Sequence, residues 1–351
     1  MTANTKLALG GVGAWAAARA LRRRRALSFA GRTVVISGGS RGLGLLVARR
    51  LVAEGARVAL LARTEADLDA ALADLGGRGG PLLGAALTGG AAIAVPCDVR
   101  DREQVEAAVA RVARELGPPS VLLHDAGVIG VGPEAHMAEE DYRRSLDVHF
   151  WGGYYLTEAL RPHLGDGARI GYVSSVAGRV AAPHLAPYSV GKHALVGYAD
   201  AVRAELAASG VRVTTITPGL MRTGSHPNAH TKGDHEAEFA WFAAADANPL
   251  LSISGDRAAD KVVDALRHGD AALTLTLPAT LGAALDGVAP GLVGGAAKLA
   301  ARLLPAPTGP KGDERRTGWE SFSDAAPSAL TRPADEATDR NNELRGHEPL
   351  T

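Results

Sequence analysis

The chain has 351 residues, and its 38 lysines and arginines are balanced by 38 aspartates and glutamates. With no net charge, the chain as a whole does not attract nucleic acid electrostatically. Its single cysteine, Cys97, excludes an internal disulfide framework and a multi-cysteine zinc site. The length favours one large α/β domain with extensions, because single cores stop growing near roughly 250 to 300 residues. A reducing, cytoplasmic compartment is expected.

Residues 1–30 form an extension that is first apolar and then basic. Leu7 to Ala20 is rich in alanine and glycine, and Arg22 to Arg25 follow it. A helix of that apolar length reaches about 21 Å, short of the roughly 30 Å hydrocarbon core, so it should not span a bilayer. A cleavable signal peptide carries its charge before the apolar stretch. The pattern fits two alternatives equally, a peripheral membrane contact with arginines at anionic head groups and a solvated extension.

From residue 31 to residue 277, strand-like apolar runs alternate with helical patterns. This alternation predicts a single doubly wound, Rossmann-like α/β domain with a parallel seven-stranded sheet flanked by helices. The expected strands are Thr33–Ser37, Arg57–Leu61, Ala92–Pro96, Val121–His124, Arg169–Ser174, Val211–Thr217 and Ala271–Leu277. The expected helices are Leu43–Glu54, Glu65–Leu75, Arg102–Leu116, Asp141–Leu160, Tyr188–Ser209 and Asp256–Arg267.

Three further segments depart from this alternation. Residues 220–255 follow the sixth strand, where an open α/β sheet often places a substrate lid. Residues 278–304 are apolar, and interrupting prolines and glycines favour a cover over the cleft or a subunit contact rather than a membrane anchor. Residues 305–351 are polar, charged and rich in proline, so we expect a disordered tail without a stable core of its own.

A glycine-rich turn joins the first expected strand to the first helix. It reads Ser37-Gly38-Gly39-Ser40-Arg41-Gly42-Leu43-Gly44. Glycines there let the backbone turn sharply, approach a diphosphate closely and aim the unpaired amides of a helix N-terminus at it. For such a turn alone, a tight packing corner is the alternative.

A second motif, Tyr188-Ser189-Val190-Gly191-Lys192, opens a predicted helix, and Ser175 lies thirteen residues before the tyrosine. In order and spacing these residues and the glycine turn resemble the short-chain dehydrogenase/reductase family, over about residues 32–277. The resemblance implies an oxidoreductase that transfers a hydride between nicotinamide and a carbonyl or secondary alcohol. Ser175 would bind the substrate oxygen, Tyr188 would transfer the proton, and Lys192 would bind the nicotinamide ribose and stabilise the Tyr188 phenolate.

The resemblance also implies further cofactor contacts. Asp98 and Val99 would lie at the adenine, Asp125-Ala126-Gly127 at the adenosine, and Pro218-Gly219 and Thr223 at the nicotinamide. After the second strand, Ala62-Arg63-Thr64 offers no acid for a ribose hydroxyl. Arg63 and Arg41 supply two guanidinium groups for a 2′-phosphate, so NADP(H) is predicted in preference to NAD(H).

Two positions depart from the family pattern. His124-Asp125 stands where the family usually has Asn-Asn, and His149 stands where an asparagine completes the catalytic tetrad. That asparagine usually supports a helix kink whose main-chain carbonyl holds a water linked to the lysine, a carbonyl that His149 could still shape. We expect activity to be retained. The alternative is a non-catalytic NADP(H)-binding regulatory or scaffold protein.

The remaining predictions concern partners. His226, His230, His235 and Glu236 lack the spacing of a histidine-rich metal site, so no metal is predicted and a lid loop is favoured. Apolar residues expected near the cleft favour a hydrophobic small-molecule alcohol or ketone, although core packing explains several of them equally well. They are Val128, Ile129, Val180, Leu185, Leu220, Phe239, Trp241 and Phe242. The resemblance alone implies a homo-oligomer.

Overall fold

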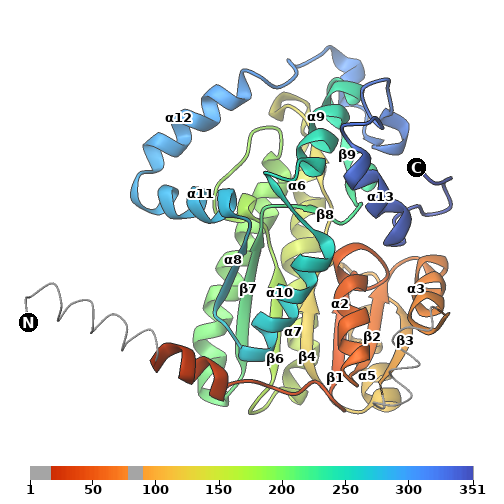
Figure 1. The fold of residues 1–351 in the computed structure, drawn as a ribbon, viewed down its shortest axis with the longest axis vertical. Helices are drawn as coiled ribbons and strands as arrows, with labels where there is room; N and C mark the ends of the chain where they lie inside the picture. Colours follow the sequence, from red (N-terminus) through yellow and green to blue (C-terminus); the bar gives the residue numbers. More distant parts are fainter. Residues whose placement is uncertain (1–16, 78–89, 351) are drawn as a thin grey trace, which may run out of the picture.

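In the computed structural model, which describes residues 17–77 and 90–350, a parallel sheet of seven strands forms the centre of the molecule (Figure 1). The strand order is β11-β7-β6-β4-β1-β2-β3. The strands are β1 (Thr33–Ser37), β2 (Arg57–Ala62), β3 (Ala91–Pro96), β4 (Pro119–His124), β6 (Arg169–Val173), β7 (Arg212–Pro218) and β11 (Ala272–Leu275). The predicted doubly wound, seven-stranded parallel sheet is confirmed.

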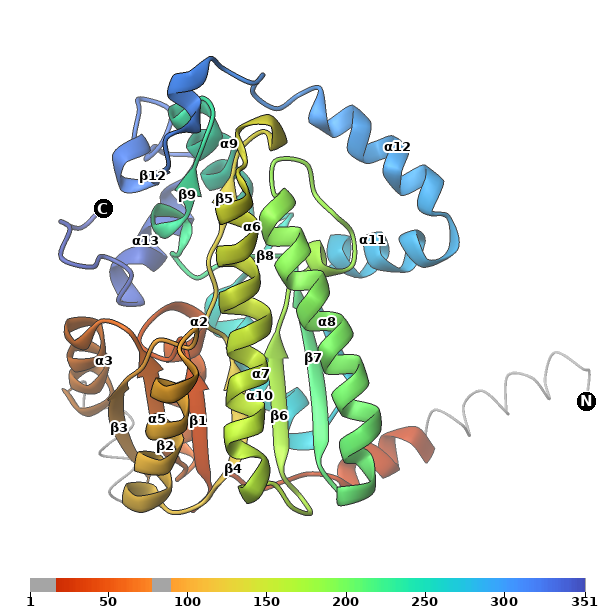
Figure 2. The same ribbon diagram turned by 180° about the vertical axis from the view of Figure 1, so that it is seen from behind.

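Helices cover both faces of this sheet (Figures 1 and 2). One face carries α2 (Gly42–Ala53), α3 (Glu65–Gly77) and α10 (Gly255–His268), and the other carries α5 (Arg102–Leu116), α7 (Gly152–Leu160) and α8 (Ala186–Leu206). In β1, Val34 and Ile36 pack on the first face and Val35 on the second, as the two-residue period of a strand requires. The strand order reverses between β1 and β4, so a ligand crevice is expected at their carboxyl ends.

Beyond this edge lie the shorter elements that shape the crevice. A three-stranded sheet joins β5 (Gly130–Val131), β9 (His230–Thr231) and β12 (Arg316–Thr317). A parallel pair joins β8 (Leu220–Arg222) and β10 (Ser252–Ser254), and α9 (His235–Ala247) packs beside both sheets. The region predicted to hold a substrate lid is therefore built from ordered strands and a helix.

The structure corrects the prediction of a disordered tail for residues 305–351. β12 pairs with β9, and α13 (Arg332–Arg340) packs on α9. The tail supplies few apolar side chains, but Ala326 and Phe322 pack with Phe239 of α9, and the two phenylalanine ring centroids are 5.2 Å apart. The tail therefore folds by packing against apolar residues of α9. The composition of the tail alone does not reveal this contact.

Helices α11 (Leu277–Val288) and α12 (Pro290–Ala301) extend to the side of the sheet beyond β11 (Figure 1). Ala279 is the only buried residue of the two helices. Their large apolar side chains are exposed, namely Leu277, Leu281, Leu285, Val288, Leu292 and Leu299. We call this pair the apolar hairpin.

The N-terminal extension is tied to the domain before residue 31. Phe29 is fully buried, and Arg22 forms ion pairs with Asp264 and Asp270 at 2.5 and 2.7 Å. The domain therefore begins earlier than the predicted boundary at Gly31, because Phe29 belongs to its core. Most of the apolar stretch Leu7 to Ala20 lies outside the described residues. Among those described, no helix is long and apolar enough to cross a membrane.

Candidate active site

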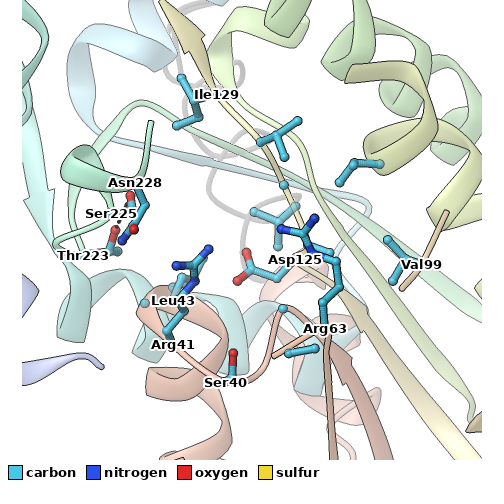
Figure 3. A pocket seen from close by; sticks show the side chains of 18 of the residues that line it. Ser40, Arg41, Leu43, Arg63, Val99, Asp125, Ile129, Thr223, Ser225 and Asn228 are labelled. Carbon is cyan, nitrogen blue, oxygen red and sulfur yellow. Dashed lines mark hydrogen bonds between the residues drawn. The ribbon is translucent and has the colours of Figure 1, made fainter. Parts of the chain in front are cut away.

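A pocket opens in the crevice at the carboxyl ends of the central strands (Figure 3). Most of the predicted cofactor residues line it: Gly38, Ser40, Arg41, Gly42, Leu43, Arg63, Asp98, Val99, Asp125, Ala126, Gly127, Tyr188, Lys192 and Thr223. The predicted residues that do not line it are Gly44, His149, Ser175, Pro218 and Gly219. The sequence motifs therefore converge on one site.

The glycine turn is held tightly against the end of β4. Gly38 has a φ of +73°, and a Cβ there would lie 2.8 Å from the Ala126 nitrogen. A Cβ on Gly44 would lie 2.2 Å from the Gly38 carbonyl oxygen, which explains why Gly44 packs against the turn instead of facing the pocket. Gly42 and Leu43 open α2 at the pocket wall, so the cradle fits a diphosphate at a helix N-terminus.

Of the three predicted catalytic groups, Tyr188 and Lys192 line this pocket, and Ser175 lies behind its lining beside Tyr188. Ser175 follows β6, and Tyr188 and Lys192 lie one helical turn apart near the start of α8. The Ser175 hydroxyl is a hydrogen-bond partner of the Tyr188 phenol. The Lys192 Nζ lies 5.6 Å from the Tyr188 ring centroid and donates to the Val173 carbonyl oxygen at 2.8 Å. This carbonyl fixes the ammonium between the sheet and the phenol.

Burial dominates the ionisation of these groups. It raises the pKa of Tyr188 to about 12, and the hydrogen bond with Ser175 opposes this rise only in part. Burial also lowers the pKa of Lys192, and the nearby Asp125 opposes that shift. The prediction that Lys192 and the charge of an oxidised nicotinamide together stabilise the Tyr188 phenolate stays a prediction.

His149 sits in a π-helical turn, η2 (Asp147–Trp151), between α6 (Glu139–Leu146) and α7. It is fully buried, and its Nε2 accepts from the Val128 backbone N–H at 3.2 Å. The ring proton therefore lies on Nδ1, which donates to the Ser145 hydroxyl at 3.2 Å. Burial lowers the pKa of His149 well below its ordinary value, so the ring is neutral.

His124 contacts the same turn from the end of β4. Its Nε2 donates to the main-chain carbonyl oxygen of His149 at 3.1 Å, and its Nδ1 accepts from the Ser37 hydroxyl at 2.8 Å. The two departures from the family pattern are therefore in direct contact. His124 engages the carbonyl at the helix kink, and one lone pair of that oxygen remains for another donor.

Asp125 follows His124 and faces the start of α2. Its carboxyl accepts from the Gly44 backbone N–H, and burial raises its pKa, opposed by Lys192. A protonated carboxyl presents one oxygen acceptor and one donor. In that state Asp125 resembles the asparagine it replaces.

Of two other predicted cofactor contacts, Asp98 lines the pocket and the Pro218-Gly219 turn does not. Asp98 lines the pocket and pairs with Arg100 at 2.5 Å, whereas the N-cap of α5 is Asp101. Gly219 donates its N–H to the Leu275 carbonyl oxygen, so the Pro218-Gly219 turn joins β7 to β11 and lies outside the pocket lining.

The histidines after β8 have separate partners. His226 pairs with Asp335 at 2.9 Å, His230 with Arg144 at 3.2 Å, and His235 with Thr231 at 3.2 Å. Within residues 17–77 and 90–350, no group of three or more ligand-type side chains could hold a metal ion.

Part of the predicted apolar lining borders the pocket. Val128 and Ile129 line it, and Ile129 packs with Leu185, Trp241 and Phe242 in a small apolar cluster. Phe239 instead packs against His226 and Phe322, on the tail side of α9. The spacing of apolar residues along α9 does not show whether Phe239 faces the pocket or the tail.

The predicted lid segment contributes Ser225, Asn228 and His230 to the pocket. The pocket also contains Arg144, Glu343 and Arg345, which sequence reasoning missed. Glu343 and Arg345 lie about three hundred residues from the glycine turn and carry no motif, so only the docking of the tail brings them to the site.

Comparison with known proteins agrees with this geometry. The profile of the short chain dehydrogenase family matches residues 32–233. The chain belongs to the short-chain dehydrogenase family.

Two relatives and one solved structure show what this short-chain dehydrogenase is similar to. A putative ketoacyl reductase of Streptomyces coelicolor is 33% identical over 208 residues, which cover 58% of this chain and 75% of the relative. The oxidoreductase UcpA of Salmonella typhimurium is 36% identical over 197 residues, covering 55% and 70%. A short chain dehydrogenase from Burkholderia cenocepacia, solved in complex with NADP, is 26% identical with a TM-score of 0.60, covering 72% of this chain and all of that one.

Proposed function

We propose that this short-chain dehydrogenase is an NADP(H)-dependent oxidoreductase that interconverts a carbonyl and a secondary alcohol in a hydrophobic small molecule. The observation that carries the proposal is the meeting of Ser175, Tyr188 and Lys192 at one end of the pocket whose other wall is the glycine turn. An isolated tyrosine and lysine pair on a helix is more often a surface pair, but here Lys192 is 3% exposed and Tyr188 is partly buried at the pocket wall.

The side chains divide the chemistry between them. A bound nicotinamide supplies or accepts the hydride at the substrate carbon. Ser175 holds the substrate oxygen against the Tyr188 hydroxyl, which gives its proton to that oxygen in reduction and takes one from it in oxidation. Lys192, fixed by the Val173 carbonyl, places positive charge near the phenol and would supply a donor to the nicotinamide ribose.

Two arginines support the preference for NADP(H). Arg41 comes from the start of α2 and Arg63 from the end of β2, and Figure 3 shows both side chains reaching into the pocket. No hydrogen-bond partner satisfies the buried Nη1 of Arg41. Two guanidinium groups fit a 2′-phosphate by charge and by hydrogen-bond geometry. The NADP complex of the Burkholderia relative is consistent with this choice.

The remaining predictions on partners stay proposals. The apolar cluster beside Ile129 supports a hydrophobic substrate, and the name of the Streptomyces relative suggests a ketone. A homo-oligomer, a cytoplasmic location and a peripheral membrane contact of the N-terminus are likewise proposed. In the N-terminal basic run, Arg22 is engaged by two aspartates, which leaves Arg23 to Arg25 exposed for such a contact.

The test is binding followed by turnover. NADPH and NADH are titrated into the purified full chain by nicotinamide fluorescence, and a panel of hydrophobic ketones is then assayed with wild type and Tyr188→Phe. We expect NADPH to bind more tightly, and Tyr188→Phe to bind it equally while losing at least 100-fold in kcat, since proton transfer by a positioned group contributes about 10²–10⁴-fold.

Tyr142→Phe, a change of the same kind in α6 away from Ser175 and Lys192, is the matched control and should keep its kcat. Binding of neither nucleotide would refute the central proposal. Tight binding with equal turnover by wild type and Tyr188→Phe would refute the role of the tyrosine.

A further inference from the structure

The tail segment 341–345 runs across the glycine turn. The Gly42 backbone N–H donates to the Asn341 carbonyl oxygen at 2.9 Å, and the Asn341 side chain donates to the Thr223 carbonyl oxygen at 3.0 Å. Asn342 donates to two carbonyl oxygens, those of Ser40 at 2.8 Å and Asp67 at 2.9 Å. These bonds connect the tail to the glycine turn, to α3 and to the bend after β8.

The next residue of the segment is buried beside the same turn. Glu343 is 2% exposed, and its carboxylate accepts from the Asn228 amide at 2.8 Å. Its second contact is with the Arg41 guanidinium at 3.5 Å. A Cβ on Gly42 would lie 2.6 Å from the Glu343 Oε1, so the glycine is also needed for the tail to approach. The segment is therefore a built part of the pocket wall.

Arg345 follows and reaches the pocket from the tail. It lines the pocket together with Arg41 and Arg63, and its nearest carboxylate, on Asp67, is 3.7 Å away. Burial and the charge of Arg41 lower the pKa of Arg345, Asp67 opposes them, and Arg63 lowers it further. Three guanidinium groups therefore line one pocket, and the carboxylates paired with two of them, Glu343 at Arg41 and Asp67 at Arg345, are 3.5 and 3.7 Å away.

The backbone of the segment supports a functional role. Asn342 and Arg345 have φ angles of +59° and +52°, in the left-handed region that side chains other than glycine rarely adopt. Such conformations are unfavourable and cluster at ligand sites. The four side-chain and main-chain bonds of Asn341 and Asn342 hold this conformation in place.

We propose that Arg345, carried to the site by the docked tail, binds the 2′-phosphate of NADP(H) together with Arg41 and Arg63. The inference rests on the proposed function and adds a specificity-determining residue from outside the part of the chain that matches the family. A phosphate monoester carries about two negative charges and three acceptor oxygens, which suits three guanidinium groups. Asn342 is a positioning residue, because it holds the segment through two carbonyl oxygens.

The test compares two nucleotides that differ only in the 2′-phosphate. Binding of 2′,5′-ADP and 5′-AMP to the full chain is measured by isothermal titration calorimetry. We expect Arg345→Met, which keeps an unbranched apolar side chain, to weaken 2′,5′-ADP binding about tenfold, which corresponds to about 1.4 kcal/mol, and 5′-AMP binding less than about twofold. Asn342→Ala should weaken 2′,5′-ADP in the same direction.

Arg332→Met is the matched control, since Arg332 is an exposed arginine of the same tail that pairs with Glu336. It should bind both nucleotides as wild type does. Equal losses of both nucleotides in Arg345→Met, or no loss of either, would overturn the inference. A wild type without preference for 2′,5′-ADP would instead refute the proposed cofactor, and the two failures are therefore distinguishable.

Discussion

All four ring nitrogens of His124 and His149 form hydrogen bonds within the domain. His124 connects Ser37 at the glycine turn to the carbonyl of His149, and His149 connects Val128 to Ser145. A buried polar group without a hydrogen-bond partner costs about 1–3 kcal/mol. Both rings are therefore neutral, with a hydrogen-bond partner at each nitrogen. The departures from the family pattern thus act as one connected pair, and the sequence alone places them twenty-five positions apart.

This neutrality predicts an acid-sensitive fold. Burial, and then the charge of Lys192, lower the pKa of His124 from 6.5 to about 4. Between these pH values the unfolded chain binds a proton that the native ring does not, so the free energy of unfolding falls as the pH falls from about 6.5 to about 4. From pH 7 to pH 5, His124 should account for a loss of about 2 kcal/mol.

Urea denaturation of wild type and His124→Gln at both pH values isolates this contribution. Subtracting the two pH dependences cancels Asp125, whose raised pKa acts in the opposite direction. His163→Gln, at the partly exposed end of η3 (Arg161–His163), is the control and should keep the wild-type pH dependence. An unchanged dependence in His124→Gln would show that this ring is protonated in the native protein.

At the scale of elements, α13 is docked by very close backbone packing. Gly224 has a φ of +87°, and a Cβ there would lie 2.2 Å from the Thr338 nitrogen. The Thr338 hydroxyl also donates to the Gly224 carbonyl oxygen at 2.8 Å. The position of α13, and with it the segment 341–345, depends on the absence of a side chain at one residue of the bend that follows β8.

Gly224→Ala should therefore release the tail. We expect a loss of about 2 kcal/mol or more in the free energy of unfolding, because both the positive φ and the contact oppose a methyl group. Trypsin should then cut at Arg340 and Arg345 faster, and 2′,5′-ADP should bind more weakly. Gly197→Ala, where a Cβ meets nothing within 4 Å, is the control and should be neutral or stabilising. If trypsin cleaved Gly224→Ala at the same rate as the wild type, this explanation of how α13 docks would be contradicted.

At the scale of the whole molecule, the apolar hairpin contributes little to the stability of the domain. Leu281 and Leu285 are 60% and 44% exposed, whereas Leu46 of α2 is 1% exposed in the core. Leu281→Gln and Leu285→Gln should each change the free energy of unfolding by less than about 0.5 kcal/mol, and Leu46→Ala should cost about 2–5 kcal/mol. Urea denaturation measures both. A cost above about 1 kcal/mol at Leu281 would indicate that the hairpin is covered in solution, for example by another subunit.

The sequence predicted the parts of the molecule that repeat a local pattern. Continuous apolar runs such as Val34 to Ile36 predict buried parallel strands, and the spacing of Ser175, Tyr188 and Lys192 predicts their meeting. It did not predict the fold of residues 305–351, because Phe322 and Ala326 pack against a helix nearly eighty residues away. For the same reason Arg345 was missed, and Phe239 was assigned to the cleft instead of to the tail.

The docked tail also has a consequence for the order of synthesis. The sheet, the glycine turn and Tyr188 all precede residue 277, and Asn341 to Arg345 emerge more than sixty residues later. At about 5–20 residues per second, the ribosome adds those residues several seconds after the last strand of the central sheet. A nascent chain can therefore assemble its reaction centre, with Arg41 and Arg63 in place, before the tail completes the wall at the phosphate end of the crevice.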